Sequence, residues 1–196
     1  MHTFNTIKEN TTAEFSEKGS KFIAYAFSIE SADEFKEHLK QLKILHPKAV
    51  HHCFAYRLGL DKNNYRSNDD GEPSGSAGKP ILGQIDSMQL TDVLVIVVRY
   101  FGGVLLGVPG LINAYKTSTA LALKCTSIIT KQVKEDYLFE FDYLQLDTLL
   151  GWAKRNNFAI RSKELDMFCR VVISLPTAES VADISKLNRH IKVTKV

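Results

Sequence analysis

Residues 92–103 read DVLVIVVRYFGG, and the unbroken apolar run inside this stretch decides the fold. A strand with one solvated face alternates apolar and polar residues, whereas a strand covered on both faces reads as a continuous apolar, β-branched run. We therefore predict a central strand over residues 92–98 that is buried on both faces. Arg99 follows directly, where a charged side chain can emerge from the core. Gly102 and Gly103 then allow a ligand or a neighbouring loop to approach closely.

Further elements are expected on both sides of this strand. Alternation and turn residues predict two more strands, over residues 19–28 and 50–58. Caps, prolines and apolar stripes predict three helices, over residues 31–46, 80–88 and 109–125. The first helix opens on a capping box between Ser31 and Glu34. The third helix has a core stripe formed by Leu111, Ala114, Tyr115, Ser118 and Ala122.

After the polar stretch 131–136 the pattern restarts. Strands are predicted over residues 137–141, 158–163, 167–174 and 191–196, and helices over 146–155 and 177–187. In the third of these strands the apolar residues Met167, Cys169, Val171 and Ile173 alternate. The order β-α-β-β-α-β is that of a ferredoxin-like unit. We therefore predict an α+β protein with two domains, residues 1–134 and residues 135–196.

Residues 67–80, SNDDGEPSGSAGKP, form the densest polar stretch. Within it, residues 69–79 hold three carboxylates, two serines, three glycines and a lysine, namely Asp69, Asp70, Glu72, Ser74, Ser76, Gly71, Gly75, Gly78 and Lys79. Backbone amides exposed just before a helix make an anion site plausible, and the carboxylates raise a Mg²⁺ hypothesis. A structural connector with turn-capping carboxylates is an equal alternative. The stretch matches neither the P-loop nor the dinucleotide-binding glycine pattern.

His51, His52 and Cys53 fall on the strand predicted over 50–58. Adjacent strand residues point to opposite faces, so His51 and Cys53 share one side and His52 faces the other. One histidine and one cysteine are too few for a structural zinc site, and we assign no metal ligands. A polar histidine in a cleft is the favoured interpretation, and a nucleophilic Cys53 paired with a histidine is an alternative that no orienting motif supports.

Arg99 has two interpretations. Its guanidinium could bind a phosphate or carboxylate bidentately. It could equally pair with Asp69, Asp70 or Glu72 and so hold two loops together, and this is the interpretation we favour.

Composition narrows the class of protein. The chain is 44% hydrophobic and 24% charged, with a net charge of +3, which is too mild to indicate a dedicated duplex-binding face. The three cysteines are widely spaced and predict reduced, mostly buried thiols. The start, MHTFNTIKENTTAEF, lacks the pattern of a signal peptide, and no apolar run approaches the roughly 20 residues that cross a bilayer. We therefore expect a cytoplasmic protein that does not interact with membranes.

Three segments in combination resemble the YigZ/IMPACT family: residues 51–56 (HHCFAY), 67–78 (SNDDGEPSGSAG) and 99–103 (RYFGG). Further matches lie in residues 18–24 and 107–115, so the resemblance covers about residues 18 to 125. The later part of the chain is similar to the small ferredoxin-like domain of bacterial members, akin in shape to the C-terminal domain of elongation factor G.

The resemblance implies a two-layer α+β N-terminal domain like that of a small-subunit ribosomal protein, followed by the smaller ferredoxin-like βαββαβ domain. It also implies a role in translation, with RNA or the ribosome as partner. Eukaryotic members carry an extra N-terminal module for which we expect no room before Gly19, so their partner-dependent kinase regulation is not carried over.

The second glycine-rich loop departs from the family pattern. Where the family commonly shows GGIKLGAGGLVRAY, this chain has Leu105 for the lysine, Pro109 for a glycine and Asn113 for the arginine. Each lost phosphate contact is expected to reduce the salt dependence of nucleic-acid binding by about one unit.

Three functions follow, in order of preference. The first is a translation-associated regulatory protein that binds RNA or the ribosome, with Tyr65 or Tyr100 as candidate stacking residues. The second is an enzyme acting on a small anionic or peptide-like substrate at the acidic loop, and the third is a protein-interaction module that uses the open face of the ferredoxin-like sheet. An enzyme would require the polar side chains to converge on one concave pocket. The candidate ligand-binding residues are His51, His52, Asp69, Asp70, Glu72, Ser74, Gly75, Ser76, Gly78, Lys79, Arg99, Tyr100, Gly102 and Gly103. No catalytic residue, cofactor or oligomeric state can be assigned from the sequence.

Overall fold

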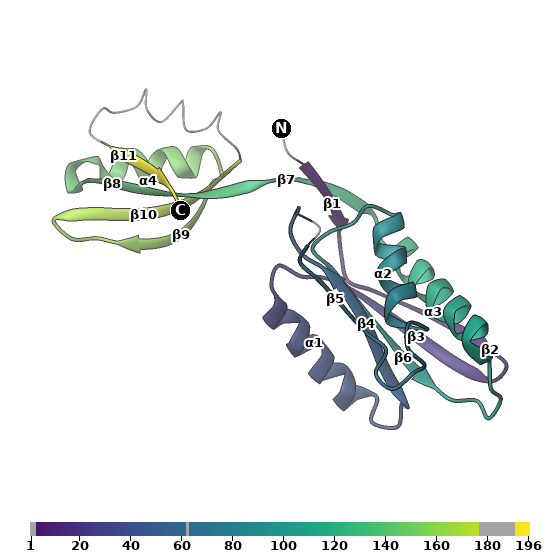
Figure 1. Ribbon diagram of the computed structural model, residues 1–196. Helices are drawn as coiled ribbons and strands as arrows, with labels where there is room; N and C mark the ends of the chain where they lie inside the picture. The colour runs from purple at the N-terminus through teal and green to yellow at the C-terminus, as the bar shows by residue number, and fades with distance from the viewer. Residues whose placement is uncertain (1–2, 62, 177–190) are drawn as a thin grey trace. The chain divides into compact units, whose positions relative to one another are not determined.

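The computed structural model describes residues 3–61, 63–176 and 191–196. Its contacts divide the chain into two compact units, one built from residues 4–131 and the other from Thr3 together with residues after 131. Figure 1 shows both units, and each is described by itself. The domain boundary suggested by the sequence, between residues 134 and 135, stays a prediction.

The first unit is built on a five-stranded antiparallel sheet with the strand order β2-β3-β6-β4-β5. Its strands are β2 (Thr11–Glu17), β3 (Ser20–Ser28), β4 (His51–Arg57), β5 (Tyr65–Asn68) and β6 (Val93–Tyr100). Its helices are α1 (Ala32–Leu45), α2 (Gly78–Ser87) and α3 (Gly107–Lys124). The predicted central strand is confirmed as β6, which pairs with β3 on one side and β4 on the other.

Both faces of β6 are covered, as its continuous apolar run requires. Val93, Val95 and Val97 pack in the core beneath α2 and α3, and the alternate residues Leu94, Ile96 and Val98 pack in the core beneath α1. The α+β class is confirmed. Helix α1 adds a layer to the two that were expected, because an apolar face of the sheet left open to water would be unfavourable.

The second unit contains a four-stranded antiparallel sheet with the order β11-β8-β10-β9, which is consistent with a ferredoxin-like fold. Its elements are β8 (Lys134–Asp142), η1 (Tyr143–Gln145), α4 (Leu146–Arg155), β9 (Ala159–Glu164), β10 (Phe168–Pro176) and β11 (Lys192–Lys195). Phe139, Leu149, Trp152 and Val171 belong to its core. The helix predicted over residues 177–187 lies outside the described residues.

Four strands have no counterpart in the sequence-based prediction. They are β1 (Thr3–Ile7), β2, β5 and β7 (Ile128–Gln132), of which β1 and β7 pair in a two-stranded sheet. Most of their residues are polar and at least partly exposed, so the alternation that marks a half-buried strand is weak. Strand β5 also corrects the loop predicted over residues 67–79, because Ser67 and Asn68 pair with β4.

Candidate functional site

The candidate residues gather where β4 begins and β6 ends. His51 is directly opposite Arg99 in the antiparallel register, and Phe22 of β3 is opposite Arg99 on the other side. Strand alternation places Arg99, His51 and Cys53 on the face covered by α2 and α3, and directs His52 to the face covered by α1. The sheet thus brings part of the predicted set together and separates the rest.

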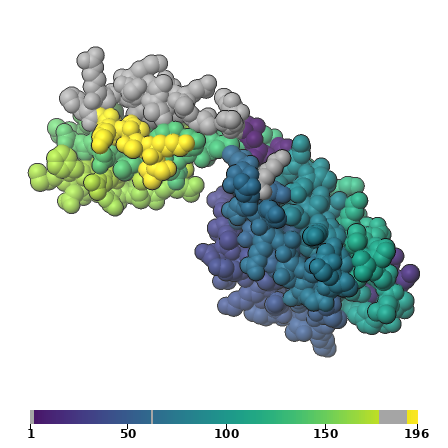
Figure 2. All heavy atoms as spheres, in the orientation of Figure 1, coloured from purple at the N-terminus to yellow at the C-terminus, as the bar shows by residue number. Residues whose placement is uncertain are grey.

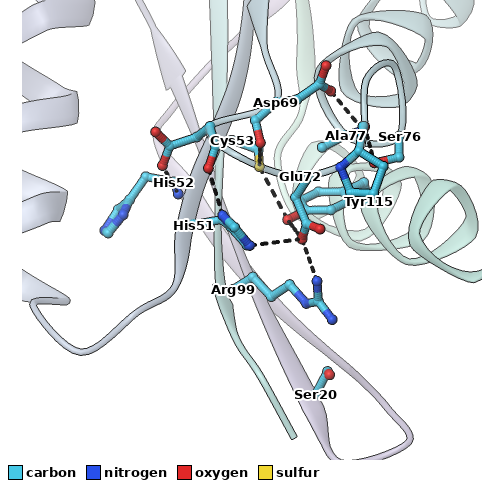
Figure 3. Close-up of polar contacts among 12 residues, drawn as sticks. Ser20, His51, His52, Cys53, Asp69, Glu72, Ser76, Ala77, Arg99 and Tyr115 are labelled. Atoms are coloured by element: carbon cyan, nitrogen blue, oxygen red, sulfur yellow. Dashed lines mark hydrogen bonds and ion pairs between the residues drawn. The ribbon is translucent and has the colours of Figure 1, made fainter. Parts of the chain in front are cut away.

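A buried ion pair forms the centre of the site (Figure 3). Nη1 of Arg99 lies 2.5 Å from Oε1 of Glu72, and the two side chains are only 7% and 3% exposed. The hydroxyl of Tyr115 on α3 donates to the same oxygen at 2.8 Å, and Nε2 of His51 lies 3.9 Å from it. A charge-assisted hydrogen bond in such a water-poor setting is stronger than one at the surface. This geometry corresponds to the interpretation of Arg99 as a link between two loops.

Cys53 lies beneath this pair. Its Sγ is 3.2 Å from the Tyr115 hydroxyl and 3.0 Å from the carbonyl oxygen of Asp69. Burial raises the pKa of the Cys53 thiol, and that of the Tyr115 hydroxyl, far above their ordinary values. Because the thiolate is the nucleophile, a thiol held protonated in this way is poorly suited to nucleophilic catalysis.

Asp69 occupies the anion site that was predicted before the second helix. Its carboxylate accepts hydrogen bonds from the backbone amides of Gly75, Ala77 and Gly78 at 2.9, 3.0 and 2.8 Å. Burial alone would raise the pKa of Asp69, but these three amides, together with the charge of Lys79, outweigh it and lower the pKa. The N-cap residue of α2, Ala77, has no capping side chain of its own, so Asp69 caps the helix from the loop.

Asp70 fastens the loop to the start of β4. Its carboxylate accepts from the backbone amide of His52 at 2.6 Å, and its carbonyl oxygen lies 2.6 Å from Nδ1 of His51. The backbone of Asp70 is left-handed, with φ of 43°, and Gly71 continues the turn with φ of 89°. The carboxylates of Asp69, Asp70 and Glu72 therefore bind different groups within the protein and do not share a common partner.

The remaining loop residues divide between structural and exposed positions. The buried Ser76 hydroxyl donates to the carbonyl of Pro73 at 2.6 Å. A Cβ on Gly78 would lie 2.7 Å from the backbone nitrogen of Asn68, so only glycine fits between α2 and β5. Ser74 and Lys79 are exposed. Among the residues that the structure describes, no cluster of three histidine, cysteine or acidic side chains could hold a metal ion.

Tyr100 belongs to a hydrogen-bonded row on the α1 face. Its hydroxyl lies 2.8 Å from Nδ1 of His46, whose Nε2 lies 2.7 Å from the hydroxyl of Tyr25. Tyr65, the other candidate for stacking, is 52% exposed and lies under the guanidinium of Arg57 at 5.3 Å. Tyr100 is thus a poor stacking platform, because its ring is partly buried and its hydroxyl is engaged.

The sequence interpretation did not single out two exposed residues at the same end of the sheet, Phe101 and Lys18. The Phe101 ring is 47% exposed, and the Arg99 guanidinium lies 5.7 Å from its centroid. Lys18 precedes Gly19 in the β2–β3 turn, and a Cβ on Gly102 would lie 1.9 Å from the carbonyl carbon of Gly19. The turn and the loop after β6 are therefore in direct backbone contact. In the sequence, Phe101 stands within the RYFGG motif, directly before the two glycines of the loop.

The comparisons with known proteins agree on one family. Residues 18–123 match the family model described as the Impact N-terminal domain. The chain is 32% identical over 161 residues to the IMPACT family member YvyE of Bacillus subtilis, covering 82% of this chain and 74% of that protein. It is 32% identical to YigZ of Escherichia coli (86% and 83% covered) and 38% identical to a member from Haemophilus influenzae (81% and 78% covered).

One solved structure is similar to the chain over its full length. A crystal structure of a hypothetical protein has a TM-score of 0.85 and 28% sequence identity, and it covers 100% of this chain and 98% of its own. The two-domain translational regulator Yih1 is 26% identical, with 62% of this chain and 47% of that chain covered and a TM-score of 0.36. Within the described residues, the helices lack the length and apolar character needed to cross a membrane.

Proposed function

This chain belongs to the IMPACT family, and from that membership we propose that it is a translation-associated regulatory protein that works in the cytoplasm and binds RNA or the ribosome. The contact surface we propose is the end of the first unit where the β2–β3 turn meets the loop after β6. We call this surface, formed by Lys18, Gly19 and residues 101–105, the turn–loop edge.

The observation that supports this surface is the backbone contact between Gly19 and Gly102. It holds the exposed cation of Lys18 beside a loop that begins with the exposed ring of Phe101. Proteins that bind single-stranded nucleic acid combine cations that follow the backbone with aromatic rings on which bases stack. The turn–loop edge has one exposed cation, on Lys18, and one exposed aromatic ring, on Phe101.

Binding is better supported than catalysis at the acidic loop. The carboxylates of Asp69, Asp70 and Glu72 each accept hydrogen bonds from within the protein, and the thiol of Cys53 is buried. Groups that are already saturated by internal partners have little capacity left for a substrate. The enzyme alternative stays a prediction.

The exposed apolar residues in this loop predict a moderate affinity with a shallow salt dependence. Leu105 is 84% exposed where the family commonly places a lysine, so this side chain contributes no phosphate contact. Each phosphate contact adds about 0.7 to the salt slope for a single strand. We therefore expect stacking on Phe101 to supply a larger share of the binding energy than charge does.

The test is a fluorescence titration of labelled single-stranded RNA, and of purified ribosomes, at several salt concentrations. The variants are Phe101→Ala and Lys18→Gln, with Ile44→Ala and Lys124→Gln as exposed apolar and cationic controls elsewhere on the unit. Loss of one stacked base should weaken binding by about 1–3 kcal/mol for Phe101→Ala, and Lys18→Gln should reduce the salt slope by about 0.7. Absence of binding at low salt, or equal losses in the control variants, would refute this surface.

A further inference from the structure

Five large apolar side chains gather at one end of the second unit. Tyr143 and Leu144 of η1 are 63% and 88% exposed, and Leu165, Met167 and Phe168 of the β9–β10 hairpin are 50%, 85% and 74% exposed. Phe168 is directly opposite Asp142, the last residue of β8, so the register places both segments at the same end of the sheet (Figure 1). We call these five residues the apolar tip.

The core does not require these side chains. The buried apolar residues of β10 are Cys169, Val171, Ile173 and Leu175. Met167, which the alternation placed with them, is exposed because β10 begins only at Phe168. The atoms of the hairpin form the outer surface of the unit at this end, seen in yellow-green in Figure 2. Clustered apolar side chains left in water at the same place mark interaction surfaces.

Acidic side chains surround the apolar tip. Residues 142–147 and 163–168 contain four carboxylates (Asp142, Asp147, Glu164 and Asp166) against one lysine (Lys163), all exposed, a local net charge of 1 − 4 = −3. The whole chain has a net charge of +3, so the tip has the opposite sign. A surface of this kind repels phosphate groups and attracts cations.

The open face of the same sheet has a different character. Glu140 pairs with Arg170 and with Lys192, each at 3.4 Å, so charged side chains cover the centre of that face. Two cations against one carboxylate give this part of the face a local charge of 2 − 1 = +1, opposite in sign to the tip, so a basic partner is not favoured there. The observations therefore favour the tip over the sheet face as the contact surface.

We propose that the apolar tip docks a basic segment of a partner protein, in which lysine or arginine side chains alternate with apolar anchors. Apolar anchors would cover Leu144 and Phe168, while the cations would face Asp142 and Asp166. RNA is disfavoured because its phosphates would meet the carboxylates, and an anionic membrane is disfavoured for the same reason. A symmetric contact between two copies would bring the same acidic residues together. The inference does not rest on the function proposed for the first unit.

The test measures binding of the full chain to three short synthetic peptides by fluorescence anisotropy. The first alternates lysine with leucine or phenylalanine, the second has glutamate in place of lysine, and the third has serine in place of the apolar residues. Only the first should bind, and its affinity should fall as salt rises, because exposed charges are screened.

Two pairs of substitutions separate the apolar and charged contributions. Leu144→Ser with Phe168→Ser should raise the dissociation constant of the first peptide about tenfold or more, since buried anchors dominate interface energies. Asp142→Asn with Asp166→Asn should raise it about two- to fivefold, in line with exposed ion pairs. Val196→Ser, at an exposed position after β11, and Glu37→Gln, at an exposed position of the first unit, should change nothing. Circular dichroism should show that all variants keep the fold, because the substituted side chains are exposed.

Several outcomes would overturn the proposal. Equal binding of the first and second peptides would show that charge does not contribute. If the Leu144→Ser/Phe168→Ser variant bound the first peptide as tightly as the unsubstituted protein does, the tip would not be the binding surface. Tip-dependent binding to phosphatidylcholine–phosphatidylserine vesicles or to labelled RNA would assign the surface to a membrane or to nucleic acid. A dimer in sedimentation that this variant abolishes would assign it to a second copy.

Discussion

Nη1 of Arg99 lies 2.5 Å from Oε1 of Glu72, and this contact joins the end of β6 to the loop that follows β5. The guanidinium also lies over the ring of Phe22, 5.4 Å from its centroid. The pair is therefore enclosed by an aromatic ring, the sheet and α3, whose Tyr115 donates to the same carboxylate. Its physical role is to hold the acidic loop in place.

The first prediction follows from the burial of this pair. Glu72→Ala should lower the free energy of unfolding by about 3–5 kcal/mol, because it leaves the Arg99 charge buried without its partner. Arg99→Met combined with Glu72→Gln should cost less than the sum of the two single changes, because each single change leaves one buried charge without its partner and the double change removes both charges. Urea denaturation of the unsubstituted protein, the Arg99→Met and Glu72→Gln single variants and the double variant gives the coupling energy.

The exposed pair of Lys36 and Asp33, at 2.7 Å, is the matched control. Its double-mutant cycle should give a coupling close to zero, because solvent screens the two charges. A coupling for Arg99 and Glu72 no larger than that of the control would contradict the structural role of the buried pair.

The second prediction concerns Asp69. Asp69→Ala should destabilise the protein by about 2–3 kcal/mol, because it removes the acceptor for three backbone amides, whereas Asp69→Asn keeps one oxygen and should cost less. Since the folded state lowers the pKa of Asp69, its contribution is present above pH of about 4 and is lost at lower pH. Thermal unfolding at pH 7 and pH 3 measures both effects. If Asp69→Ala were as stable as Glu37→Ala, a change at an exposed position, the capping role would be wrong.

Some features of the site could be predicted from the sequence and others could not, because they depend on different physical rules. Strand alternation was enough to place His51 and Cys53 on one face and His52 on the other. The continuous apolar run was enough to identify β6 as buried on both faces. These rules are local and depend only on the period of the strand.

The partners of the loop carboxylates depend on the path of the backbone, which the sequence alone does not determine. Asp69 reaches the amides of α2 only because Asp70 and Gly71 turn with positive φ. The exposure of Phe101 depends likewise on how the loop after β6 meets the β2–β3 turn. Strand β2 was not predicted because most of its residues are polar and only Ala13 and Phe15 pack against the core, so its apolar alternation is short.

The third prediction concerns pH and the α1 face. Burial lowers the pKa values of His38, His46 and His52, and the charge of Lys21 lowers that of His46 further. The unfolded chain therefore binds more protons below pH of about 6.5, and stability should fall as the pH falls from 7.5 to 5.5. The slope is limited to about 1.4 kcal/mol per pH unit for each histidine.

Urea denaturation at several pH values measures this slope, and His46→Gln should reduce it. The glutamine can still form hydrogen bonds with Tyr25 and Tyr100, so stability at pH 7.5 should change little. A slope that is unchanged in this variant would show that His46 does not take part in the pH dependence.

The last prediction compares two glycines whose surroundings differ. A Cβ on Gly102 would lie 1.9 Å from the carbonyl carbon of Gly19, whereas a Cβ on Gly83, inside α2, would meet nothing within 4 Å. Gly102→Ala should therefore force the β2–β3 turn away from the loop after β6, with a large fall in the melting temperature and weaker RNA binding if the turn–loop edge is the contact surface. Gly83→Ala should stabilise the protein by about 0.5–1 kcal/mol, because alanine favours the helix and restricts the unfolded chain. If both substitutions shifted the melting temperature in the same direction, the contact between Gly19 and Gly102 would not be the constraint that fixes this edge.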